Sequence, residues 1–104
     1  MQICLRVFAF GFLLLSAVSS VADTGDRVTI LYDAFGEHSS MKKDWGFAAL
    51  IEYHGKRILF DTGNDARTFA DNVDAAGVDL RKLDFVVISH RHLDHTAGLS
   101  TCLR

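Results

Sequence analysis

The stretch that decides the fold is DFVVISHRHLDHTAGL, residues 84–99. Its opening segment, residues 84–89, is a continuous apolar run of the kind found in a β-strand buried on both faces of a sheet. A dense group of polar side chains follows this run directly. In open α/β sheets, ligands usually bind beyond the carboxyl ends of the strands. The sequence therefore predicts a buried strand that carries a functional site at its end.

The polar group contains three histidines and one aspartate: His90, His92, Asp94 and His95. In extended backbone, alternate side chains point to one side, so His90, His92 and Asp94 can converge. A turn or helix start at Asp94 would bring His95 toward the same pocket. Imidazole and carboxylate ligands suit zinc, and also iron or manganese. A solvated histidine-rich loop is the alternative, but this density of ligands favours a metal site, with two histidines for one ion and an Asp–His pair for a second.

A second motif is LFDTGN, residues 59–64, at the end of another predicted strand. Asp61 in this motif has two compatible interpretations. It can belong to a turn that caps the following helix. It can also be a buried aspartate near the metals that holds a ligand, or the histidine loop, by hydrogen bonds.

The remaining chain predicts an α/β arrangement in which a helix covers a sheet. Residues 65–76 repeat apolar side chains at three- and four-residue spacing, as in a helix with one buried stripe, and Gly77 can end it. β-Branched and aromatic runs predict the strands. The expected elements are a strand at 27–35, a loop at 36–44, hairpin arms at 45–53 and 56–60 around His54-Gly55, and core aromatics Trp45, Phe47, Phe60 and Phe69.

The first 22 residues are typical of an export signal. Arg6 is the only charge before Asp23, an apolar segment follows at residues 7–18, and Ser20-Val21-Ala22 has the small-x-small pattern of a cleavage site. That apolar segment is too short to cross about 30 Å of hydrocarbon, although an uncleaved anchor is the alternative. We expect residues 1–22 to be a signal peptide and residues 23–104 to be exported, periplasmic or secreted, without a stable membrane span.

Composition narrows the class of protein. Hydrophobic residues make up 49% of the 104 residues and charged residues 23%, which indicates one small globular domain. The eleven Lys and Arg are scattered among thirteen Asp and Glu, so no nucleic-acid partner is expected. Cys102 is the single cysteine after the signal, and therefore no internal disulfide is expected in the exported chain.

His-x-His-x-Asp-His at residues 90–95, with Asp61-Thr62-Gly63 at an earlier strand end, resembles the metallo-β-lactamase superfamily. The resemblance covers residues 28–99. Its spacing is most similar to the branch that resembles dihydropterin and ribofuranosylaminobenzene-phosphate synthases. It implies an αββα sandwich of two similar halves, with the metals at one edge between the sheets.

The resemblance also implies roles for these residues. His90 and His92 would ligate a first zinc ion, and Asp94 and His95 a second; iron or manganese could replace zinc. Asp94 would also be catalytic by orienting the water that attacks a small-molecule substrate, and Asp61 would match the superfamily's aspartate at the strand end.

This sequence departs from the family pattern because the downstream ligands and the second half of the sandwich are missing. We therefore expect a fragment of a longer metallo-hydrolase, which by itself retains zinc poorly and does not hydrolyse substrate. A non-catalytic relic or weak metal-binding module is one alternative. A dihydropterin-synthase-like transferase is another.

Overall fold

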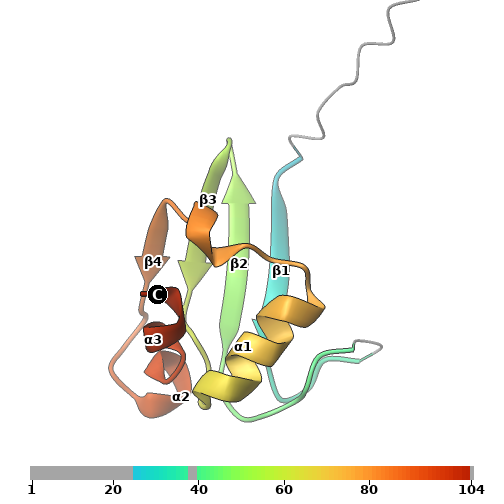
Figure 1. The fold of residues 1–104 in the computed structure, drawn as a ribbon, viewed down its shortest axis with the longest axis vertical. Coiled ribbons are helices and arrows are strands. Elements are labelled where there is room, and N and C mark those ends of the chain that lie inside the picture. The colour runs from blue at the N-terminus through green and yellow to red at the C-terminus, as the bar shows by residue number, and fades with distance from the viewer. Residues whose placement is uncertain (1–24, 38–39, 104) are drawn as a thin grey trace, which may run out of the picture.

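The computed structural model describes residues 25–37 and 40–103, which form a mixed α/β unit built on one four-stranded sheet. Figure 1 shows helix α1 lying across one face of that sheet, with the short C-terminal helices beside it. The elements in chain order are β1 (Arg27–Tyr32), β2 (Ala48–Tyr53), β3 (Lys56–Phe60), α1 (Ala66–Ala75), η1 (Leu80–Lys82), β4 (Phe85–Val87), α2 (Leu93–Thr96) and α3 (Leu99–Cys102).

The strand order β1-β2-β3-β4 combines antiparallel and parallel pairing. β1 pairs antiparallel with β2, and β2 with β3, whereas β4 runs parallel to β3 with Phe60 opposite Val87. The tight turn at His54 and Gly55 has φ angles of 46° and 76°, which suit a two-residue hairpin. Because β3 and β4 are parallel, their carboxyl ends lie at the same edge of the sheet. Asp61 and the residues after Val87 are therefore neighbours.

The core lies between α1 and the sheet. Phe69 and Val73 of α1 are buried against Leu31, Leu50 and Leu59 of the strands. The helix begins where the Asp65 carboxylate accepts a hydrogen bond from the backbone N–H of Thr68 at 2.7 Å. It ends before Gly77, whose φ of 67° is the left-handed conformation that favours glycine. The predicted hairpin and helix are both confirmed.

Two predicted strands are too long. The first strand ends at Tyr32 rather than at residue 35, because the Asp33 side chain accepts a hydrogen bond from the backbone of Gly36 and bends the chain. The hairpin begins at Ala48 rather than at residue 45. Gly46 precedes it with a φ of 130°, which is not strand geometry.

The prediction of a strand buried on both faces at residues 84–89 is wrong for this structure. β4 has only three residues, and the side chains of Phe85, Val86 and Val87 are 58%, 38% and 41% exposed. Among the described residues, β3 is its one neighbour in the sheet. The apolar side chains of β4 favour burial, but β4 is an edge strand of the sheet. No described element covers these side chains on the side away from β3.

Three sequence expectations concern the ends of the chain. The predicted signal peptide, residues 1–22, lies outside the described residues. Within the described part, no helix has the length and apolar character to cross a membrane. Cys102 is a free thiol there, and burial raises its pKa.

Asn72 is a buried polar residue that no sequence motif marks. Its side-chain N–H groups donate to the backbone oxygens of Leu31 and Lys42, both at 2.9 Å. Its side-chain oxygen accepts from the backbone N–H of Lys42 at 2.7 Å. One amide on α1 thus fixes both β1 and the loop that leads to β2.

Asn72→Asp should lower the free energy of unfolding by about 2 kcal/mol or more, because it replaces two donors by an acceptor in a buried site. Urea unfolding followed by circular dichroism measures this loss. Asp74→Asn, at an exposed position of the same helix, is the matched control and should leave the midpoint unchanged. Equal midpoints for the two variants would contradict the role of Asn72.

Candidate metal centre

The candidate site lies at the edge of the sheet where β3 and β4 end. Asp61 follows β3 directly, and its backbone N–H donates to the carbonyl of Val87 at 2.9 Å. Its φ of 58° is unusual for a residue other than glycine and turns the chain away from the strand direction. The side chain is buried, with the residue only 1% exposed. This conformation aims a carboxylate from the end of β3 at the loop that follows β4.

The Asp61 carboxylate joins the strand end to the histidine motif through three hydrogen bonds. It accepts from the backbone N–H and the hydroxyl of Ser89, both at 2.7 Å. It also lies 2.7 Å from Nδ1 of His95, which therefore carries a hydrogen and donates. Burial alone raises the pKa of Asp61, but the hydrogen bonds from Ser89 and His95 outweigh it and hold the pKa below its usual value. Asp61 is thus a buried carboxylate with its charge stabilised.

The Asp61-Thr62-Gly63 turn is hydrogen-bonded to α2 and to the residues that follow it. The backbone N–H and the hydroxyl of Thr62 both donate to the carbonyl of His95, at 2.8 and 3.1 Å. The N–H of Gly98 donates to the carbonyl of Thr62 at 3.2 Å. A Cβ at Gly98 would lie 2.4 Å from that carbonyl oxygen, so only glycine allows this close approach. The turn and the histidine motif are therefore one packed unit.

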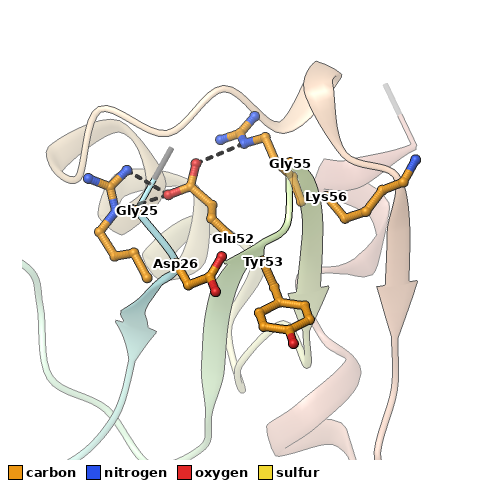
Figure 2. A pocket seen from close by; sticks show the side chains of 8 residues that line it. Gly25, Asp26, Glu52, Tyr53, Gly55 and Lys56 are labelled. Atoms are coloured by element: carbon orange, nitrogen blue, oxygen red, sulfur yellow. Dashed lines mark hydrogen bonds and ion pairs between the residues drawn. The ribbon is translucent and has the colours of Figure 1, made fainter. Parts of the chain in front are cut away.

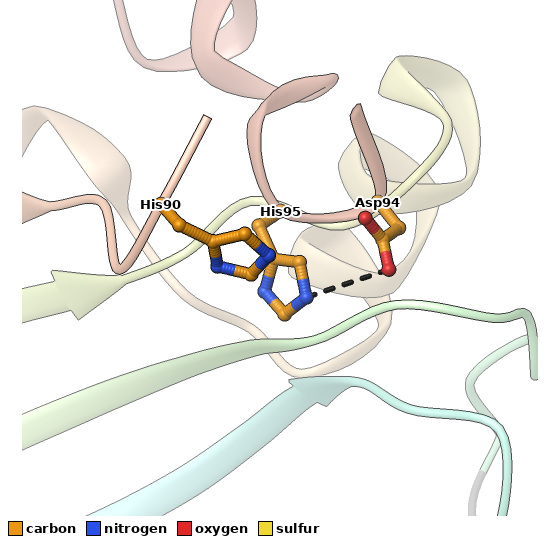
Figure 3. Close-up of side chains that lie close together, drawn as sticks. All are labelled: His90, Asp94 and His95. Atoms are coloured by element: carbon orange, nitrogen blue, oxygen red, sulfur yellow. Dashed lines mark ion pairs between the residues drawn. The ribbon is translucent and has the colours of Figure 1, made fainter. Parts of the chain in front are cut away.

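Three of the four predicted metal ligands meet at this edge. Figure 3 shows the side chains of His90, Asp94 and His95 close together, with His90 on the loop after β4 and the other two on α2. Each offers a ligand atom, and these atoms lie within 4.8 Å of one another. Oδ2 of Asp94 is 3.4 Å from Nε2 of His95. No comparable group of metal-ligating side chains occurs elsewhere in residues 25–37 and 40–103.

His92 lies outside this group, although its ring packs edge-on against that of His90 at a centroid distance of 4.7 Å. The alternation of an extended chain, which predicted that His90, His92 and Asp94 converge, stops because α2 begins at Leu93. The helix start brings Asp94 and His95 together with His90 and leaves His92 exposed at the helix boundary. The assignment of His90 and His92 to one ion, and of Asp94 and His95 to another, stays a prediction.

The donor set fits a borderline cation such as zinc. Nδ1 of His95 donates to Asp61, and Nδ1 of His90 is 2.9 Å from the Ser89 hydroxyl, so Nε2 of each ring is left for a ligand bond. Two imidazoles and one carboxylate make the three protein ligands that catalytic zinc commonly has, with one position open. Of the metals predicted, zinc, iron and manganese all accept these donors, and the geometry does not select one.

A hollow with aromatic walls adjoins the centre. Its volume is about 370 Å³, and Phe35, Trp45 and Phe47 line it together with Asp94 and His95. Trp45, expected in the core from its sequence, is 66% exposed, and Phe35 is 78% exposed. The burial of an aromatic side chain in a loop depends on its packing partners, which the sequence does not specify. The aromatic groups instead form a surface beside the candidate ligands.

Figure 2 shows a second hollow, of about 470 Å³, at the hairpin end of the sheet. Glu52 lies there between two guanidinium groups, 2.6 Å from that of Arg27 and 3.2 Å from that of Arg57. The hydrogen bond from Arg27, followed by the weaker influence of Arg57, holds the pKa of Glu52 below its usual value. These charges are already paired within the sheet. We therefore assign this cluster a structural role.

Comparison with known proteins identifies relatives of the site-bearing half. Residues 56–104 match the family described as "Beta-lactamase superfamily domain". The matched segment contains Asp61 and the whole histidine motif, and it omits β1 and β2.

Curated relatives extend the match toward the N-terminus. The uncharacterized protein MJ0448 of Methanocaldococcus jannaschii is 44% identical over 54 residues, which cover 52% of this chain and 21% of that protein. The 7,8-dihydropterin-6-methyl-4-(beta-D-ribofuranosyl)-aminobenzene-5'-phosphate synthase of the same organism is 35% identical over 75 residues, or 68% of this chain and 26% of the synthase. Ribonuclease Z of Bradyrhizobium diazoefficiens is 38% identical over 52 residues, or 50% of this chain and 16% of the enzyme. The chain thus spans at most about a quarter of these relatives.

Asp61→Asn should destabilise the fold by about 2–3 kcal/mol, because an amide cannot accept all the hydrogen bonds that the buried carboxylate receives from Ser89 and His95. Urea unfolding without added metal measures the loss. Asp94→Asn is the control: that carboxylate lies in the same centre without a comparable set of donors, and its loss should barely change stability. A stability loss of equal size in both variants would contradict the anchoring role of Asp61.

Proposed function

We propose that this chain, which carries the N-terminal part of a metallo-β-lactamase superfamily domain, is part of a metal-dependent hydrolase. The metal that we propose is zinc. The observation that carries this proposal is the meeting of His90, Asp94 and His95 at the ends of two parallel strands. The hydrogen bond between Asp61 and His95 supports the proposal, because the buried carboxylate binds Nδ1 of His95 and leaves Nε2 of that ring for an ion.

As the family pattern implies, His90 and His92 would hold one ion and Asp94 and His95 a second, and three of these four side chains, His90, Asp94 and His95, already offer ligand atoms within 4.8 Å of one another. When bound, zinc would supply a nucleophilic water near neutral pH and polarise the bond under attack. Asp94 would also orient that water, and its carboxylate lies 3.4 Å from Nε2 of His95.

The substrate we propose is a small molecule with an apolar or aromatic portion. Asp94 and His95 belong both to the metal centre and to the hollow that Phe35, Trp45 and Phe47 line. A substrate bound against these rings would place its polar, reacting part next to the ligands and exclude bulk water from one side. The even mixture of basic and acidic residues gives no support to a nucleic-acid substrate.

A synthase or transferase is the second candidate. The relative with the longest of the three matches is named as a 7,8-dihydropterin-6-methyl-4-(beta-D-ribofuranosyl)-aminobenzene-5'-phosphate synthase. The same ligands can serve either chemistry, because fold and metal site do not fix the substrate. The location that we propose, outside the cytoplasm, rests on the signal-like residues 1–22 alone.

Zinc binding can be tested with the 104-residue chain. Titration against a chromophoric chelator should give a weak zinc affinity, which His90→Ala and His95→Ala each reduce at least tenfold, because each removes a ligand. His54→Ala, in the hairpin turn, is the control and should bind like the unaltered chain. Affinities that are the same for all four proteins would contradict the site. Two zinc ions per chain after exhaustive dialysis would contradict the weak affinity.

Hydrolysis should be tested on the protein that the gene encodes, after sequencing both sides of these 104 codons. A panel of one lactone, one thioester, one phosphodiester and one β-lactam, each with an aromatic group, covers the main bond types. We expect turnover of at least one compound, lost on chelation and in His90→Ala, and restored by zinc only in the unaltered protein. Zinc-dependent pterin condensation without any hydrolysis would instead favour the synthase.

A further inference from the structure

The hydroxyl of Ser89 lies between the buried carboxylate and the first histidine of the motif. Its Oγ is 2.7 Å from Oδ2 of Asp61 and 2.9 Å from Nδ1 of His90. The backbone N–H of the same serine donates to the other oxygen of Asp61 at 2.7 Å. Ser89 therefore contacts the carboxylate twice and the imidazole once.

The direction of these hydrogen bonds follows from the chemistry of the groups. Asp61 accepts from the backbone N–H of Ser89, and an ionised carboxylate can only accept, so the Ser89 hydroxyl uses its one hydrogen to donate to it. Toward His90 the same oxygen can then act only as an acceptor. Nδ1 of His90 must therefore carry the hydrogen and donate to Ser89. In a neutral ring this leaves the lone pair on Nε2.

His90 and His95 thus depend on the same carboxylate by different routes. His95 donates to Asp61 directly, at 2.7 Å, whereas His90 reaches it through Ser89. The rings lie 4.2 Å apart between centroids, and a ligand atom of each lies within 4.8 Å of the other. Free histidine in water favours the opposite tautomer, with the hydrogen on Nε2. A local acceptor is therefore needed to hold the form that can bind a metal through that atom.

We propose that Ser89 is a positioning residue. Its hydroxyl donates a hydrogen bond to Asp61 and accepts one from Nδ1 of His90, and this pair of hydrogen bonds fixes the tautomer and ring orientation of His90. The metal-binding consequence rests on the proposed function, but the tautomer of His90 does not. Ser89→Ala removes these two hydrogen bonds alone, because the backbone N–H of residue 89 and Nδ1 of His95 still reach Asp61. Ser89→Thr keeps a hydroxyl at the same Cβ. The two variants therefore separate the hydrogen bond from the fold.

The test is long-range ¹H–¹⁵N NMR of the metal-free chain labelled at its histidines, at about pH 8.5, where an ordinary imidazole is neutral. We expect His90 to carry its hydrogen on Nδ1 in the unaltered chain and in Ser89→Thr, and mainly on Nε2 in Ser89→Ala. His95 should keep its hydrogen on Nδ1 in all three. A His90 with its hydrogen on Nε2 in the unaltered chain, or unchanged by Ser89→Ala, would overturn the proposal.

Zinc titration adds the functional readout. Loss of an orienting hydrogen bond behind a metal-ligating histidine typically weakens affinity by about 10–100-fold. Ser89→Ala should fall in that range, and Ser89→Thr should return close to the unaltered value. Ser100→Ala, an exposed serine on α3, is the control for both measurements. If the unaltered chain binds no zinc, the proposed function fails, while the tautomer result still decides the role of Ser89.

Discussion

The hydrogen bonds of the Asp61 carboxylate are the interaction on which the rest of this structure depends. A buried charge is tolerated only when it is well paired or hydrogen-bonded, and here Ser89 and His95 supply the donors. Those donors come from the segment after β4, so the pairing closes the fold between residues far apart in sequence. The same bonds orient the imidazole of His95. Stability of the fold and geometry of the site therefore have one origin.

Parallel pairing of β3 and β4 is what brings this carboxylate to the histidines. An antiparallel β4 would place the residues after Val87 at the hairpin end of the sheet, beside Glu52 and its arginines. Parallel strands need a crossover connection, and α1 supplies it with a core built from Phe69 and Val73. The helix therefore serves the site indirectly: it returns the chain to the correct end of the sheet.

Local signals in the sequence predicted the hairpin and the helix, although not the exact ends of the strands. β-Branched and aromatic runs, the helical apolar spacing, the turn at His54 and Gly55, and Gly77 after α1 each act within a few residues, so the hairpin and helix could be read directly. The exposure of β4 and of Trp45 could not be predicted from the sequence, because it depends on which other segments cover these side chains. His92 was grouped with the other histidines by assuming an extended chain, and α2 begins one residue later.

The role of Ser89 was hidden for a different reason. A serine before a histidine is chemically ordinary, and its importance follows only from the carboxylate that β3 places 2.7 Å from its hydroxyl. A carboxylate behind an imidazole increases the basicity of the ring and so strengthens its bond to a cation. His95 receives this effect directly, and His90 receives it through Ser89. The two candidate histidine ligands therefore draw their orientation and basicity from one negative charge that the fold keeps buried.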